Sequence, residues 1–187
     1  MAERLEPLER RRRILARAIA IIDEEGFQGL TMRRLARECE MSAPGLMHYF
    51  PDMPALLVGV VAYRDERDAY GFDPPPSGPG VSRALLAMVV QNIVDRPKAA
   101  ELFAMVEAQA IDPRHPGHDY FKSRSLQVTD DFEFYLAAEF AEPRELALQL
   151  IAILDGLQLN WLRDQSAFDL PARFFAIADP LMDAARR

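Results

Sequence analysis

Side chains suited to recognition chemistry gather in the twenty residues from Thr31 to Phe50. Arg33 carries a guanidinium, which can pair with a phosphate or with the edge of a guanine. Thr31, His48 and Tyr49 add hydroxyl and ring N–H groups, which donate hydrogen bonds to phosphate oxygens. The chain contains no nucleophile with a spaced base, no P-loop and no glycine-rich dinucleotide turn. These residues therefore favour nucleic-acid binding over catalysis.

Two short helices must position these groups. Thr31 is a good cap for a helix over about residues 32–39. Ser42 offers a second cap, and Pro44 suits the first turn of a second helix over about 43–49. Two helices joined by a turn of three or four residues form a helix-turn-helix, whose second helix lies in the DNA major groove. An ordinary helical hairpin inside an all-α domain is the alternative.

The second helix would turn Leu46 and Phe50 inward as anchors. Gly45 costs about 1 kcal/mol in a helix relative to alanine, which suggests that another surface comes close to its backbone. The edge of a DNA duplex would satisfy that requirement. The residues expected to face the duplex are Ser42, Ala43, Pro44, Gly45, Met47, His48 and Tyr49.

The sequence around these helices resembles the amino-terminal domain of the TetR family of bacterial transcriptional regulators. The matching stretch is RRRILARAIAIIDEEGFQGLTMRRLARECEMSAPGLMHYFPDMPALL, and LDGLQLNWL over residues 154–162 resembles the dimerisation helix of many members. Members often carry a tyrosine at the position of Met47 and a lysine at that of Met53, and both usually contact phosphates. Each missing phosphate contact should reduce the salt slope of DNA binding by about 1.

The resemblance implies a homodimeric, ligand-responsive repressor that a small-molecule effector releases from a pseudo-palindromic operator in double-stranded DNA. Two recognition helices held about 34 to 36 Å apart would meet successive major grooves. Effector binding would move the fourth helix and change that spacing. The expected DNA-binding residues are Arg11, Thr31, Arg33, Ser42, Ala43, Pro44, Gly45, Met47, His48 and Tyr49.

The net charge of −7 is opposite in sign to that expected of a nucleic-acid-binding chain, but it is unevenly distributed. Residues 1–50 hold nine arginines and eight acidic residues, a net charge of +1, so the remainder carries −8. Arg10 to Arg13 form a basic run near the start of the first expected helix. That run suits contact with phosphates or a minor groove, and a solvated helix face is the alternative.

Composition predicts a soluble cytoplasmic protein without a membrane partner, because no run of about 18 apolar residues and no apolar signal core occur. The single cysteine, Cys39, excludes an internal disulfide and a cysteine zinc cluster. We expect it to be a small core residue, with a redox-sensing thiol as the alternative. No cofactor is expected.

The chain is expected to be all-α, because it lacks β-branched runs with the alternation of a strand. An amino-terminal three-helix DNA-binding domain should be followed by a linking helix, a linker rich in proline and glycine, and a larger helical ligand-binding and dimerisation domain. The expected boundaries are 1–50, 52–70, 71–80 and 81–187. Helices are predicted at about 7–25, 81–95, 98–111, 117–140, 144–164 and 171–185, with the fourth helix beginning at Asp52.

The helix predicted at 144–164 is apolar on almost every side, so both of its sides must be covered. One side can pack on its own domain and the other needs a partner, with Gly156 permitting close approach. A homodimer through a four-helix bundle follows, and a central helix in a monomeric bundle is the alternative. The predicted interface comprises Leu150, Leu154, Gly156, Leu157, Trp161, Phe174, Ile177 and Leu181.

Polar residues interrupt the apolar stripes of the helices between the linker and this bundle. Asn92 lies four residues after Met88, and Gln109 lies four after Met105. A few polar groups in a wall rich in aromatic residues and methionine suit a pocket for an apolar or amphipathic ligand, although an ordinary core has the same pattern. The predicted lining is Met88, Asn92, Phe103, Met105, Gln109, Ser125, Phe132 and Tyr135.

One loop supports a rival hypothesis, a metal-binding or enzymatic protein. His115 and His118, with Asp112 and Asp119, form DPRHPGHD and supply nitrogen and oxygen ligands for a metal ion. The proline and glycine between them mark a loop, however, and the third histidine, His48, belongs to the expected recognition helix. We therefore favour a solvated loop and expect no bound metal.

Overall fold

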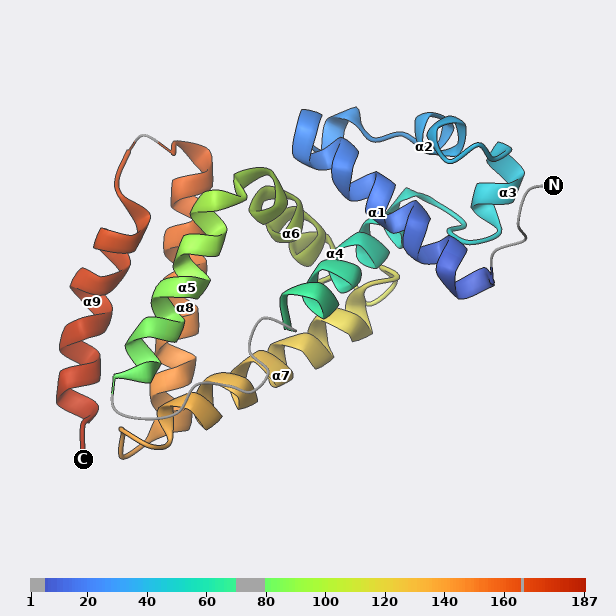
Figure 1. The fold of residues 1–187 in the computed structure, drawn as a ribbon. Helices are drawn as coiled ribbons and strands as arrows, with labels where there is room; N and C mark the ends of the chain where they lie inside the picture. The colour runs from blue at the N-terminus through green and yellow to red at the C-terminus, as the bar shows by residue number, and fades with distance from the viewer. Residues whose placement is uncertain (1–5, 70–79, 166) are drawn as a thin grey trace. The chain divides into compact units, whose positions relative to one another are not determined.

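The computed structural model describes residues 6–69, 80–165 and 167–187. Within those ranges the chain is helical and contains no strand, apart from an isolated bridge between Phe140 and Arg186 (Figure 1). The prediction of an all-α fold with an amino-terminal helix-turn-helix is confirmed. The helices are α1 (Pro7–Glu25), the 3-10 turn η1 (Phe27–Gly29), α2 (Met32–Glu38), α3 (Ala43–Met47), α4 (Met53–Ala69), α5 (Val81–Asp95), α6 (Pro97–Gln109), α7 (His118–Leu136), α8 (Pro143–Arg163) and α9 (Leu170–Ala185).

The chain divides into two compact units. Unit 1 comprises the described residues of 1–73 together with 101–119, and unit 2 comprises those of 74–100 and 120–187. Most of α6 therefore belongs with the amino-terminal helices. The functional division into DNA-binding and ligand-binding domains stays a prediction. The predicted linker over 71–80 lies outside the described residues except for Gly80.

Helices α1 and α4 build the core of unit 1. The carboxylate of Asp52 accepts a hydrogen bond from the amide N–H of Ala55 at 2.8 Å and so caps the start of α4, as predicted. Gly59 lets the two helices approach closely, because a β-carbon there would lie 2.8 Å from the ring of Phe50 and 3.2 Å from the side chain of Leu15. Buried residues of the two helices are Ile14, Leu15, Ala18, Ile19, Ile21, Ile22, Leu56, Val60 and Val61.

The core of unit 2 is apolar and lies between α5, α8 and α9. Helix α9 packs along α8 and also against α5 (Figure 1). The three helices place apolar residues three and four positions apart on their facing sides, which is the pattern of helix packing in a bundle. The largest fully buried side chains of this core are Phe140, Leu150, Leu170 and Phe174.

Helix α7 ends at Leu136, four residues before the predicted end at 140. The helix ends before Phe140, whose side chain is fully buried. Its neighbour Ala141 instead pairs with the carboxyl-terminal segment, because the Ala141 N–H donates to the carbonyl of Ala185 at 3.0 Å. Glu139 then caps α5, since its carboxylate accepts hydrogen bonds from the amides of Gly80 at 3.0 Å and Ser82 at 3.2 Å. These contacts join positions far apart in sequence.

None of the helices in the described residues combines the length and apolar character needed to cross a membrane.

Candidate nucleic-acid interface

Residues 31–50, here called the recognition corner, form the predicted helix-turn-helix. The amide N–H of Arg34 donates to Thr31 Oγ1 at 3.2 Å, and that of Gly45 donates to Ser42 Oγ at 3.1 Å. Both predicted caps are therefore confirmed. Each satisfies one of the amides that a helix leaves free in its first turn. The second helix is shorter than predicted: α3 ends at Met47, and a turn carries the chain through His48.

The turn between α2 and α3 is a Schellman motif. Met41 N–H donates to the carbonyl of Ala36 at 2.8 Å, and Glu40 N–H donates to that of Arg37 at 3.1 Å. Glu40 occupies the left-handed position with φ 54°, where glycine is usual. This turn sets the angle at which α3 leaves α2.

The inner side of the recognition corner is apolar. Leu46 and Phe50 are 0% and 1% exposed, so their predicted role as inward anchors is confirmed. Leu35 and Ala36 bury the corresponding side of α2. A helix of five residues has little stability of its own, so α3 depends on these contacts for its position.

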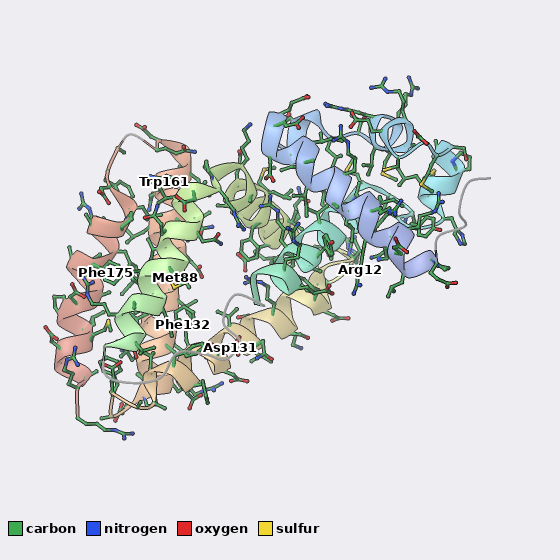
Figure 2. All side chains as sticks on the ribbon, viewed as in Figure 1. Arg12, Met88, Asp131, Phe132, Trp161 and Phe175 are labelled. Atoms are coloured by element: carbon green, nitrogen blue, oxygen red, sulfur yellow. The ribbon has the colours of Figure 1, made fainter. Side chains whose placement is uncertain are left out.

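Arg11 was expected to contact DNA, but the structure turns its guanidinium into the protein. Arg11 Nη1 donates to the carbonyl of Tyr49 at 3.0 Å, and its Cζ lies 4.2 Å from the centre of the Phe50 ring. The group therefore satisfies an acceptor just beyond α3 and stacks on an anchor residue. This geometry corrects the expectation: Arg11 braces the recognition corner. Its neighbour Arg12 is exposed on α1 (Figure 2).

A charged network behind the corner centres on Arg34, which the sequence analysis did not single out. Arg34 donates to both carboxylate oxygens of Glu25, at 2.5 and 2.6 Å, and to Glu38 at 2.8 Å. Arg17 donates to Glu38 as well, at 2.6 Å. The spacing of Arg34 and Glu38, four residues apart in one helix, was visible in the sequence, whereas the pairing with Glu25 was not.

These contacts shift the pKa values of the paired groups. The hydrogen bonds that Arg34 donates to Glu25 and then to Glu38 raise the pKa of Arg34. The hydrogen bond from Arg34 lowers the pKa of Glu38, and Arg17 lowers it further. Both groups stay charged across the physiological range. Arg34 Nη1 also donates to the carbonyl of Gly29 at 3.1 Å, so the network ties α1, α2 and the end of η1 together.

The outer side of the corner carries the remaining predicted residues. Gly45 and Tyr49 are half-buried. A β-carbon at Gly45 would lie 3.1 Å from Ser42 Oγ, so the cap itself crowds this position. The exposed members are Thr31, Arg33, Ser42, Ala43, Pro44, Met47 and His48. Their contact with DNA stays a prediction, and their exposure leaves them accessible for it.

The residues predicted for an effector pocket belong to both units. Met88, Asn92 and Ser125 are exposed in unit 2, where Phe132 packs against the core and Tyr135 is half-buried. Figure 2 marks Met88 on α5 and Phe132 on α7. The members in unit 1 are Phe103, Met105 and Gln109. A pocket made from this set stays a prediction.

The residues predicted for the dimer interface divide into buried and accessible groups. Four of the predicted interface residues are buried within one chain and have almost no surface left for a second chain: Leu150, Leu154, Trp161 and Phe174. The structure therefore corrects their assignment to the interface. Leu157 and Leu181 pack partly against the same core. Ile177 is 41% exposed, and nothing lies within 4 Å of a β-carbon placed on Gly156.

Several groups of the 112–119 loop are hydrogen-bonded to one another or to the backbone, although His115 Nε2 is buried without a hydrogen-bond partner. His115 Nδ1 accepts a hydrogen bond from Gly117 N–H at 3.2 Å, and His118 Nδ1 lies 2.9 Å from the carbonyl oxygen of Ala110. Asp112 pairs with Arg114 at 2.7 Å, which lowers the pKa of Asp112. In the part of the chain that the structure describes, no three His, Cys, Asp or Glu side chains are placed to hold one metal ion. The metal hypothesis gains no support.

Cys39 lies at the end of α2 and is half-buried. Burial raises the pKa of its thiol, which disfavours the reactive thiolate form. Cys39 is therefore only partly within the core, and its expected role as a small core residue stays a prediction.

A short capped helix, a tight turn and a second capped helix on an apolar base define a helix-turn-helix DNA-binding protein. Residues 14–60 match the family model described as "Bacterial regulatory proteins, tetR family". This match identifies the amino-terminal helix-turn-helix as the DNA-binding region of a TetR-type regulator.

Similar proteins agree with this assignment. The chain is 28% identical over 187 residues to the HTH-type transcriptional repressor KstR of Rhodococcus jostii, covering 96% of this chain and 86% of that one. The crystal structure of a TetR-family regulator from Rhodococcus sp. has a TM-score of 0.70 at 23% identity, covering 93% and 99% of the two chains. That of the multidrug binding protein EbrR, complexed with imidazole, has a TM-score of 0.64 at 21% identity, covering 97% of each chain.

Proposed function

We propose that the chain is a ligand-responsive transcriptional repressor that binds a pseudo-palindromic operator as a homodimer. The recognition corner carries this proposal, because Leu46 and Phe50 anchor it in the core while Arg33, Ser42 and His48 stay exposed. Regulators of the TetR family are generally DNA-binding proteins without enzymatic activity. A regulator of bacterial genes acts in the cytoplasm, where the chromosome lies.

On the DNA, the start of α3 would face the major groove. Ser42, Ala43, Pro44 and Gly45 are small enough for bases or backbone to come close to them. Arg33 would pair with a guanine or a phosphate, while Thr31, His48 and Tyr49 would contact phosphates. Arg11 would act indirectly, by holding the end of α3 through the carbonyl of Tyr49.

A homodimer would use the accessible sides of α8 and α9. Leu148 and Leu159 on α8 are 48% and 46% exposed, and Ile177 on α9 is 41% exposed. Gly156 lies between the two leucines in sequence and would let a second helix approach its backbone closely. This revised interface keeps Gly156 and Ile177 from the predicted set.

Two substitutions of one residue test the dimer. Gly156→Leu should give a folded monomer, because its own chain leaves space for the side chain while a partner helix would clash with it. Gly156→Ala adds a single methyl group and serves as the matched control, which should remain dimeric in analytical ultracentrifugation. A dimeric Gly156→Leu variant would place the interface elsewhere.

An effector of apolar or amphipathic chemistry would lower the affinity for the operator. The similar protein EbrR is described as a multidrug binding protein, and its structure contains imidazole, which supports a ligand-responsive function for this chain. The effector must bind the DNA-free arrangement more tightly than the DNA-bound one for release to occur. A ligand that binds without lowering operator affinity would refute this coupling.

Selection of bound fragments from sheared genomic DNA of the source organism tests the function as a whole. At about 150 mM salt, screened non-specific attraction is suppressed and a specific site should be enriched. Enrichment of one palindromic sequence is the expected result. Uniform recovery of fragments across the genome would contradict a specific regulator.

A further inference from the structure

Helix α3 carries no side chain that can donate a hydrogen bond. Its residues are Ala43, Pro44, Gly45, Leu46 and Met47. None of these side chains has an N–H or O–H group, and the sulfur of methionine is only a weak acceptor. The side chains within α3 therefore have no good means of reading DNA bases through hydrogen bonds.

Three of these residues share one exposed side of the helix, here called the outer face of α3: Ala43, Pro44 and Met47. Met47 follows Ala43 by four positions and Pro44 by three, so the three side chains are neighbours on the helix surface. Met47 is 53% exposed, whereas Leu46 is 0% exposed and anchors the helix in the core. The outer face of α3 is thus apolar and accessible.

The polar side chains nearest to this face lie at the ends of α3 or on α2. Ser42 Oγ accepts from the Gly45 N–H at 3.1 Å, which holds the hydroxyl over the first turn of α3. The ring of His48 follows the last residue of the helix and meets the ring of Tyr49 edge to face, with 5.6 Å between their centres. The exposed guanidinium of Arg33 belongs to α2. Polar readout of bases would therefore come from α2, and α3 would supply apolar contacts.

The major groove of DNA offers one apolar group on its base edges, the C5-methyl group of thymine. The other groups on these edges are hydrogen-bond donors and acceptors, which lose free energy when they are covered by apolar side chains. A methionine side chain is flexible and polarisable, so it can adapt its shape to a methyl group. A protein partner suits this face less well, because three side chains are far fewer than the roughly 20 to 30 residues per side of a stable interface.

We propose that the outer face of α3 reads the C5-methyl groups of thymines in each half-site of the operator, with Met47 as the residue that determines this specificity. The inference rests on the proposed function, because it assigns a base chemistry to the same recognition corner. Each half-site should accordingly contain thymine where α3 enters the major groove, beside the guanine or phosphate assigned to Arg33.

The test replaces thymine by deoxyuridine, one position at a time, in the operator fragment selected from genomic DNA. Deoxyuridine pairs like thymine and lacks only the C5-methyl group. Binding to the native full-length chain is measured by fluorescence anisotropy. Since burial of one methyl group corresponds to about threefold to fivefold in affinity, we expect a loss of this size at one or more positions in each half-site.

Matched methionine variants connect the methyl group to α3. Met47→Ala should bind the thymine and deoxyuridine fragments equally, because the side chain that covers the methyl group is gone. Met47→Leu keeps a large apolar side chain and should retain most of the difference. Met88→Ala removes a methionine of almost the same exposure, 54%, from α5 in unit 2 and should retain the full difference (Figure 2).

A comparison with amplified DNA separates thymine from 5-methylcytosine, which carries the same methyl group. A fragment amplified by the polymerase chain reaction contains thymine but no 5-methylcytosine. Undiminished affinity for the amplified operator supports thymine as the base that is read. Loss of affinity on amplification would overturn the proposal in favour of 5-methylcytosine.

Two further results would overturn the proposal while leaving the proposed function intact. Equal affinities of the native chain for the thymine and deoxyuridine fragments at every position would show that α3 reads no methyl group. A full difference in Met47→Ala would assign the methyl contact to another residue. Failure to select any operator fragment would instead overturn the proposed function, and this inference with it.

Discussion

The recognition corner and the α8–α9 pair are stabilised in different ways. The corner contains helices of 7 and 5 residues, capped at their first turns and tied from behind by Arg11 and Arg34. The α8–α9 pair contains helices of 21 and 16 residues, which pack through a continuous apolar core. Side-chain hydrogen bonds and ion pairs thus fix the orientation of the helices in the recognition corner, whereas apolar packing fixes it in the α8–α9 pair.

The polar contacts of the recognition corner explain how its short helices can leave a surface available for a ligand. Helices as short as α2 and α3 bury few apolar groups, so polar contacts must fix their orientation. In the corner these contacts lie on the side of α1, and the outer residues need no partner within the protein. The long helices of unit 2 can bury one side and still present exposed apolar residues on another.

We expect the greatest loss of stability from a substitution in the apolar core of unit 2. Phe174 is 0% exposed in the core of unit 2, so Phe174→Ala should lower the free energy of unfolding by about 3 to 5 kcal/mol. Phe134→Ala, at a residue that is 68% exposed, is the control and should change it by about 0.5 kcal/mol or less. Urea unfolding measures both, and similar losses would contradict the assigned core.

The next effect tests the close packing beneath the recognition corner. Gly59→Ala would place a methyl group 2.8 Å from the ring of Phe50, so we expect a loss of about 1 to 3 kcal/mol in the free energy of unfolding. Operator binding should weaken as well, because Phe50 anchors the corner. Gly156→Ala adds the same group in open space and should not destabilise the fold. A fully stable Gly59→Ala variant would disprove this contact.

The turn between α2 and α3 offers a stabilising substitution at Glu40. Glu40 has φ 54°, a conformation that costs a non-glycine residue about 1 to 2 kcal/mol. Glycine relieves this strain but gives the unfolded chain more conformational entropy, which offsets part of the gain. Glu40→Gly should therefore stabilise the fold by about 0.5 to 1 kcal/mol. Glu66→Gly, near the carboxyl end of α4, should instead destabilise it. Thermal unfolding distinguishes the two, and destabilisation by both would refute the argument.

The smallest effect is a dependence on pH in unit 2. Burial alone would raise the pKa of Glu139, but hydrogen bonds from Ser82 and from the Gly80 amide lower it below the usual 4.5. Ionised Glu139 therefore stabilises the fold above the pKa of the unfolded chain, and this contribution is lost as the pH falls through the lower, folded pKa.

Glu139→Gln should accordingly be less stable than the native chain at pH 6, with a difference that shrinks towards pH 3. The measurement is urea unfolding at several pH values, with Glu142→Gln at an exposed neighbour as the control. A difference that stays constant from pH 6 to pH 3 would mean that the carboxylate charge plays no part.

The sequence was most informative where structure depends on neighbouring residues. Thr31, Ser42 and Asp52 are caps, and each acts on an amide three residues away, so the starts of α2, α3 and α4 could be predicted. Proline and glycine act on the backbone of their own segment, so they allowed the ends of most other helices to be predicted.

Long-range contacts explain what the sequence analysis missed. The pairing of Arg11 with Tyr49 joins residues 38 positions apart, so a basic run gave no sign that one of its members turns inward. Helix α8 is apolar on nearly every side, and the pattern could not tell which leucines face α9 and which face solvent. A cleft lined by Gln91, Trp161 and Phe168 forms from three separate segments, and no local spacing marks it.

The most direct test of the account compares the affinities of two arginine variants for the selected operator fragment at one salt concentration. Arg33 lies in the recognition corner and Arg187 is an exposed arginine of unit 2. Arg33→Ala should weaken binding by about tenfold or more, as expected for loss of a specific contact worth about 1 to 3 kcal/mol, while Arg187→Ala should bind like the native chain. Equal affinities for the two variants, both folded, would contradict the assignment of residues 31–50 as the DNA-binding surface.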